Sequence, residues 1–142
     1  MNEQELRQAL GAMEVYKAQL EGILEQQQLV QMSLEELARG KATVSEFMKA
    51  EEGDEVLVPV GGGSFVRAKA NDSKKVLVNV GSGITIEKTA EEALQLMDLR
   101  AQEMMDAMKK LGESRQVIEM KSEQLSQMLQ AEYERMGQQA PM

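Results

Sequence analysis

Cysteine and histidine are both missing from this chain of 142 residues. Without cysteine there is no disulfide framework, thiol nucleophile or thiolate metal site. Without histidine, the commonest general base and the commonest transition-metal ligand are also missing. We therefore expect neither catalysis nor a metal or other cofactor, so the protein is predicted not to be an enzyme.

Aromatic side chains are scarce too: the chain has two Tyr, two Phe and no Trp. Globular cores usually draw much of their packed area from aromatic residues. Methionine is abundant instead, with twelve copies, among many Ala, Glu, Lys, Leu and Gln residues. This composition is typical of long helices rather than of one compact core.

Long hydrophobic runs are absent as well. No apolar stretch approaches the roughly 20 residues that a membrane-spanning helix needs. The first residues, Met-Asn-Glu-Gln-Glu, lack the pattern of a secretory signal. We therefore expect a soluble, cytoplasmic protein with no membrane partner.

The net charge of −8 is concentrated at the two ends of the chain. Residues 1–53 hold ten acidic and five basic side chains, and residues 90–142 hold ten and six. Residues 54–89 hold four acidic and five basic side chains. Acidic arms repel a phosphate backbone, so no nucleic-acid partner is expected.

The N-terminal arm has the periodicity of a coiled coil. With Leu6 at heptad position a, eleven of thirteen a and d positions are apolar. These positions are Leu6, Ala9, Met13, Tyr16, Leu20, Ile23, Gln27, Val30, Leu34, Leu37, Lys41, Val44 and Met48. The first arm is therefore predicted to form one helix with an apolar seam.

The C-terminal arm begins at a predicted capping box, Thr89-Ala90-Glu91-Glu92. Ten of its thirteen a and d positions are apolar. These positions are Leu94, Met97, Ala101, Met104, Met108, Leu111, Arg115, Ile118, Ser122, Leu125, Leu129, Glu132 and Met136. Polar seam residues either fix the register or loosen the coil; among them, Gln27 and Arg115 are predicted to lie at the same height.

Four short β-branched segments separated by glycine-rich turns lie between the arms. They cover residues 55–60, 64–69, 75–80 and 84–87, and they predict two β-hairpins. The glycine clusters at 61–63 and 81–83 fit neither GxGxxG nor GxxxxGK[ST], and each leads into a strand. They therefore predict hairpin turns rather than a nucleotide site.

The predicted fold is α+β and mostly helical: a long antiparallel coiled-coil hairpin with two central β-hairpins. Its parts are a coiled-coil helix at 1–53, two β-hairpins at 54–88 and a second coiled-coil helix at 89–142. The equal arm lengths favour pairing within one chain, and a parallel dimer of separate coils is the alternative.

The apolar strand residues are expected to meet other chains, because isolated hairpins are marginally stable in water. The predicted interface residues are Val56, Val58, Val60, Phe65, Val76, Val78, Val80, Ile84 and Ile86. We therefore expect the two hairpins to build an oligomeric β-barrel platform.

The free ends of the arms are candidates for binding apolar polypeptides. Leu10, Val15, Met128 and Tyr133 lie off the seam, and seam residues near fraying ends would be transiently exposed. Methionine suits a surface that accepts many partners. The predicted tip residues are Leu6, Leu10, Met13, Leu125, Met128, Leu129 and Met136.

The central segment resembles the alpha class of the prefoldin family, archaeal type. The resemblance is carried by residues 52–65 (EGDEVLVPVGGGSF) and 78–88 (VNVGSGITIEK). It implies a hexamer of two alpha and four beta subunits, with a double β-barrel platform and six coiled coils. It further implies that the coil tips hold non-native polypeptides without ATP and deliver them to a group II chaperonin.

One other function fits the sequence pattern alone. A structural coiled-coil adaptor would bind one specific folded partner through a helix face. Such an adaptor would not protect unrelated denatured proteins from aggregation, so the two functions are experimentally distinct.

Overall fold

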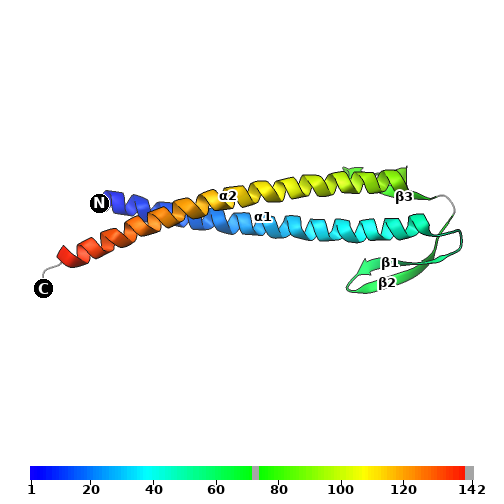
Figure 1. The fold of residues 1–142 in the computed structure, drawn as a ribbon, viewed down its shortest axis with the longest axis horizontal. Helices are drawn as coiled ribbons and strands as arrows, with labels where there is room; N and C mark the ends of the chain where they lie inside the picture. Colours follow the sequence, from blue (N-terminus) through cyan, green and yellow to red (C-terminus); the bar gives the residue numbers. More distant parts are fainter. Residues whose placement is uncertain (72–73, 140–142) are drawn as a thin grey trace. The chain divides into compact units, whose positions relative to one another are not determined.

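The computed structural model describes residues 1–71 and 74–139, which form two long helices and two β-hairpins (Figure 1). The elements are α1 (Glu3–Lys49), β1 (Glu55–Gly61), β2 (Ser64–Lys69), β3 (Lys75–Gly81), β4 (Ile84–Thr89) and α2 (Ala90–Gln139). Their types and order confirm the predicted, mostly helical α+β fold class. The β-barrel platform belongs to an assembly and stays a prediction.

The chain divides into two compact units. The coil unit comprises Met1–Val30 with Asp106–Met142, and the hairpin unit comprises Gln31–Met105. This division follows contacts within the folded chain. The predicted segments 1–53, 54–88 and 89–142 follow element type instead, and they stay a prediction.

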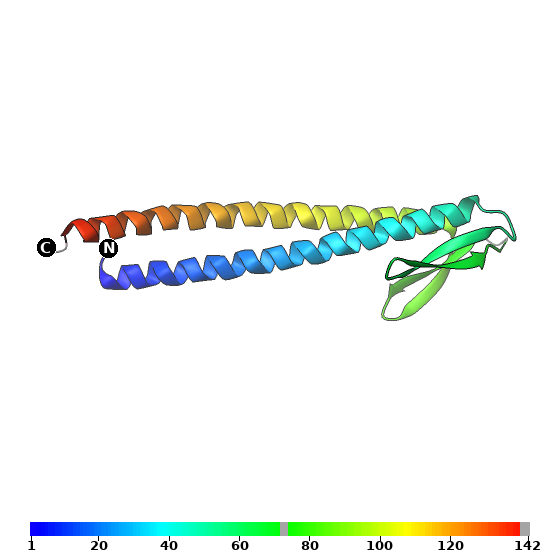
Figure 2. The same ribbon diagram turned by 90° about the horizontal axis from the view of Figure 1, so that it is seen from below.

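In the coil unit, α1 and α2 run side by side in opposite directions (Figure 2). The Met1 amino nitrogen lies 3.1 Å from Glu132 Oε1. Farther along, Arg115 donates a hydrogen bond from Nη1 to Gln27 Oε1 at 3.5 Å. The predicted common height of Gln27 and Arg115 is thereby confirmed, which favours a register-fixing role for this polar pair.

The heptad seam is covered in both helices. Every predicted a and d residue is buried or half-buried, except Met48 and Met136. Helix α1 also continues without a break through Gly40. A continuous 3.5-residue apolar period places one stripe of side chains against the partner helix, which explains this pattern of burial.

In the hairpin unit the helices are also antiparallel. Lys41 forms an ion pair with Asp98, and Met97 lies beside Gly40, where Cε is 3.6 Å from the position a Cβ would occupy. A Cβ at position 40 would make only an ordinary van der Waals contact with this side chain, so Met97 does not by itself require a glycine there.

The two hairpins are separate two-stranded antiparallel sheets with the same design. Val56-Leu57-Val58 in β1 recurs twenty residues later as Val76-Leu77-Val78 in β3. Each hairpin closes through a two-residue turn with positive φ at both positions: +60° and +73° at Gly62 and Gly63, +51° and +73° at Ser82 and Gly83. Such a turn matches the natural twist of the strands, which explains the glycine-rich sequence.

Side chains at the strand ends fasten the hairpins to the helices. Thr89 Oγ1 accepts a hydrogen bond from the Glu92 amide at 3.1 Å, and so caps α2 as the sequence predicted. Lys74 Nζ donates to the Phe47 carbonyl at 3.1 Å, one of the last carbonyls of α1. The ammonium also lies 5.5 Å from the centre of the Phe47 ring. The Phe47 carbonyl also accepts a longer hydrogen bond from the Ala50 amide, at 3.3 Å, so the ammonium is a second and charged donor at the C-terminal end of α1.

Candidate functional site

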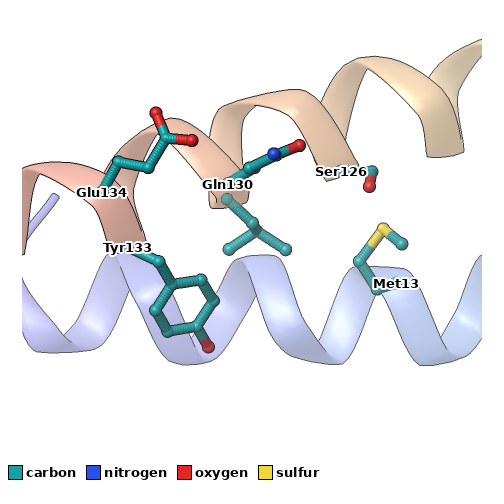
Figure 3. Close-up of a pocket in the computed structure, with 6 residues that line it drawn as sticks. Met13, Ser126, Gln130, Tyr133 and Glu134 are labelled. Atoms are coloured by element: carbon teal, nitrogen blue, oxygen red, sulfur yellow. The ribbon is translucent and has the colours of Figure 1, made fainter.

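An open groove in the coil unit brings together residues from both helices (Figure 3). Its volume is about 460 Å³. Met13 of α1 forms one side, and Leu129 and Tyr133 of α2 form the other. Ser126, Gln130 and Glu134 complete the lining. The groove presents an apolar floor with polar groups at its edges, so it suits a flexible apolar side chain better than a charged one.

The predicted tip residues divide into three groups by exposure. Leu10, Met128 and Met136 are exposed, with 42%, 55% and 47% of their surface accessible. Leu6, Met13 and Leu125 are half-buried, and Leu129 is buried. Only Met13 and Leu129 of this set line the groove, so the structure gathers part of the predicted set at one site.

Ser126, Gln130, Tyr133 and Glu134 line the groove but were not among the predicted tip residues. Tyr133 was the easiest of these to find from the sequence, because it is a large aromatic residue off the seam. In the structure it is 53% exposed. The small Ser126 gave a second signal, because a short side chain next to a seam leaves space that neighbours do not fill. Polarity alone did not distinguish Gln130 and Glu134 from any other solvated helix residue.

A buried carboxylate lies close to this groove. Glu132 occupies a seam position and is 8% exposed. It accepts hydrogen bonds from the Arg135 guanidinium and also lies beside the Met1 amino group. The hydrogen bonds from Arg135 lower the pKa of Glu132 below its usual value, against burial, which acts to raise it. Glu132 therefore stays charged inside the coil.

The hairpin unit exposes a large apolar surface. Val60, Phe65, Val80, Ile84 and Ile86 are all exposed, Phe65 to 61%. Val56, Val58 and Val76 are half-buried. Exposed apolar area of this kind marks an interaction surface, although the role of each residue in an oligomer stays a prediction.

Val78 differs from the other predicted interface residues. It is 7% exposed within the chain itself, so it has little surface left to offer another chain. Its neighbour Leu77 is 75% exposed, yet it was not among the predicted interface residues. Leu57, at the equivalent position of the first hairpin, is also exposed. Alternation along a strand separates two faces, but the sequence does not say which of them the chain covers itself.

Beneath the strands lies another groove of about 390 Å³. It is bounded by Val44 and Phe47 of α1 and by Val56, Leu57 and Leu77 of the strands, among others. The strands and α1 therefore leave an open, largely apolar groove in the hairpin unit.

Neither helix, over the residues that the structure describes, combines the length and apolar character of a membrane span.

Known proteins match the chain over most of its length. The sequence profile of the "Prefoldin subunit" family matches residues 16–135. The prefoldin subunit alpha of Methanothrix thermoacetophila is 35% identical over 110 residues, which cover 78% of this chain and 72% of the relative.

Two solved structures have similar folds. A filamentous PFD from Methanocaldococcus jannaschii is 32% identical with a TM-score of 0.53, over 92% of this chain and 98% of the other. The prefoldin beta subunit from Thermococcus strain KS-1 has a TM-score of 0.58 at 17% identity, over 89% and 90% of the two chains. The second similarity concerns the fold alone.

The family profile, the curated relative and the predicted fold class agree, and they confirm the resemblance read from the strand segments. The chain therefore belongs to the prefoldin family of chaperone subunits.

Proposed function

We propose that this chain is the alpha subunit of a prefoldin that captures non-native polypeptides at the ends of its coiled coils, without ATP. The observation that carries this proposal is the open, apolar groove around Met13, Leu129 and Tyr133 in the coil unit. A flexible methionine and a broad aromatic face accept many apolar side chains without demanding one shape. The proposed function is a binding function, and the chain is not proposed to catalyse a reaction.

The proposed assembly is a hexamer with beta-class subunits, two alpha and four beta. The exposed strand residues support it, because a pair of two-stranded sheets with a bare apolar surface is marginally stable alone. Covering Phe65, Ile84 and Leu77 with strands from other chains would remove that surface from water. We further propose that captured chains pass to a group II chaperonin, and that this handover takes place in the cytoplasm.

Deletion of residues 1–12 and 126–142 tests the proposed site. The deletion removes most of the groove but leaves the strands intact, so the hexamer should still assemble. Suppression of aggregation of two unrelated denatured proteins should be reduced, because the coil ends of this chain no longer contribute while those of the beta-class subunits remain. Native mass spectrometry would verify the assembly, and light scattering would follow the aggregation.

Full suppression by the assembled, truncated hexamer would exclude a contribution of this chain's coil ends to capture. Protection of one of the two clients only would instead indicate a subunit that recognises a specific partner.

A further inference from the structure

A second groove in the coil unit adjoins the first. It has a volume of about 390 Å³ and is lined mainly by α1, with Leu20 and Leu24 on its floor and Ser122 of α2 opposite. Met13 lines both grooves, so they share a wall. Because Met13 lines both hollows, we describe them together as the Met13 groove, with two halves.

Both halves of the Met13 groove open on the same face of the coil. Leu24 of α1 and Tyr133 of α2 each follow a d residue, so both occupy e positions. On a helical wheel, e flanks a, and reversing one helix brings the two e flanks to the same face. A client segment can therefore lie along the coil and contact both helices.

Small side chains at the seam and beside it help to explain why the groove is there. Ser122 occupies an a position where the coil otherwise places large apolar side chains, and Ser126 lies one turn further along α2. Met13 lines both halves, with Ser126 among the residues of one half and Ser122 among those of the other. The serines leave space that a client side chain can fill, and apolar atoms that gain contacts there stabilise the complex.

The rim of the Met13 groove is acidic. Glu14 and Glu21 line it from α1 and Glu134 from α2, while Lys17 is the one basic residue among the lining residues. A different groove, on the g face of the same unit, is lined by Leu29, Leu111 and Ser114 among others, and its one charged lining residue is Lys110. The two faces of the coil unit therefore differ in the sign of charge they offer a ligand.

We propose that the Met13 groove selects client segments in which apolar side chains alternate with lysine or arginine. Apolar client side chains would fill the space over Met13, and basic client side chains would meet the three rim carboxylates. Carboxylates at a binding surface favour ligands with basic side chains and disfavour ligands with acidic ones. The proposal rests on the proposed chaperone function and specifies the substrate class of that same site.

The test uses two labelled synthetic peptides of equal length and equal Leu and Phe content. One has interspersed lysines and the other has glutamates at the same positions. Fluorescence anisotropy with the assembled complex should show tighter binding of the lysine peptide, by about fivefold or more, since several weak charge pairs contribute. The difference should shrink as salt is raised, because these charges are exposed.

Two variants with matched controls assign the binding to the groove. Ser126→Trp fills it and should weaken binding by about tenfold, the scale of one well-buried side chain; Ser114→Trp fills the opposite groove and should change affinity less than about twofold. The charge reversal Glu14→Lys with Glu21→Lys should invert the preference between the peptides. Reversal of the outward-facing Glu25 and Glu113, both exposed, should preserve that preference.

The outcomes separate the substrate class from the proposed function. Equal affinity for both peptides would overturn the charge preference and leave capture at the coil ends intact. If Ser114→Trp weakens binding and Ser126→Trp does not, the ligand binds the groove on the g face, and the proposal for the Met13 groove is wrong. Aggregation suppression that survives undiminished after removal of residues 1–12 and 126–142 would instead overturn the proposed function itself. Circular dichroism of each variant would verify that the helices are retained.

Discussion

Glu132 keeps a negative charge at a seam position because Arg135, on the next turn of α2, donates hydrogen bonds to it. Its pKa is lowered in the folded chain. A lowered pKa means that the unfolded chain takes up the proton first, so the carboxylate stabilises the fold above the usual glutamate pKa. That stabilisation is lost as the pH falls from about 4.5 toward the lowered pKa.

Glu132→Gln should therefore reduce the acid sensitivity of the coil. We expect the free energy of unfolding of Glu132→Gln to fall less steeply below about pH 4.5 than that of the unaltered chain. Urea unfolding followed by circular dichroism at several pH values, at fixed protein concentration, measures the slope. Arg135→Met removes the hydrogen-bond donor to Glu132, so it should also make the free energy of unfolding depend less steeply on pH. If the pH dependence of the free energy of unfolding is unchanged in both variants, protonation of Glu132 does not contribute to the acid sensitivity of the fold.

Val78 and Leu77 are adjacent in β3 and offer a matched pair of substitutions. Val78→Asp puts a charge into a site that the chain itself buries, so it should lower the stability of the isolated chain by several kcal/mol. Leu77→Asp alters an exposed side chain, so it should change that stability by only about 0.5 kcal/mol.

Assembly should respond to Leu77→Asp even though folding does not. A carboxylate at this exposed strand position would oppose burial against another chain, so the complex with beta-class subunits should dissociate. Size-exclusion chromatography with light scattering measures the mass, and urea unfolding measures the stability. A destabilised Leu77→Asp chain, or a stable Val78→Asp chain, would contradict the assignment of the two faces.

At the scale of the elements, Thr89 is both the last residue of β4 and the N-terminal cap of α2. Thr89→Ala removes the acceptor for the Glu92 amide and should lower stability by about 1 kcal/mol. Thr89→Ser keeps the hydroxyl acceptor, and serine is at least as good a cap as threonine, so it should change stability by no more than a few tenths of a kcal/mol. The midpoint of urea unfolding measures both. Equal losses for Ala and Ser would mean that strand packing, rather than the cap, explains the effect.

The helices and hairpins were predictable because their signals are local and repeated. The seam recurs over thirteen positions in each arm, and the turns need glycine at fixed offsets. The burial of Val78 was not predictable in the same way. It depends on which strand face meets the chain's own helices, and two-residue alternation fits either orientation equally well.

At the scale of the whole molecule, the groove around Met13 required the partner helix to be placed in register. Ser122 and Ser126 are visible in the sequence, but only the pairing of the two helices brings each of them to a hollow that Met13 also lines. Met13 and Leu129 were predicted from their nearness to the free ends. Tyr133 was noticed as off-seam, but its place at the groove follows only from the pairing of the two helices.

Assembly and capture are connected by the number of grooves that one client can reach. Each groove is shallow and open, so each contact should be weak, and several coils in one complex would act together through effective concentration. We expect a long unfolded client to bind the assembled complex about 10²–10⁴ times more tightly than it binds the dissociated Leu77→Asp chain. A short peptide that fills one groove should bind both forms equally. Anisotropy titrations with the two ligands measure this, and equal affinities for the long client would mean that a single coil accounts for capture.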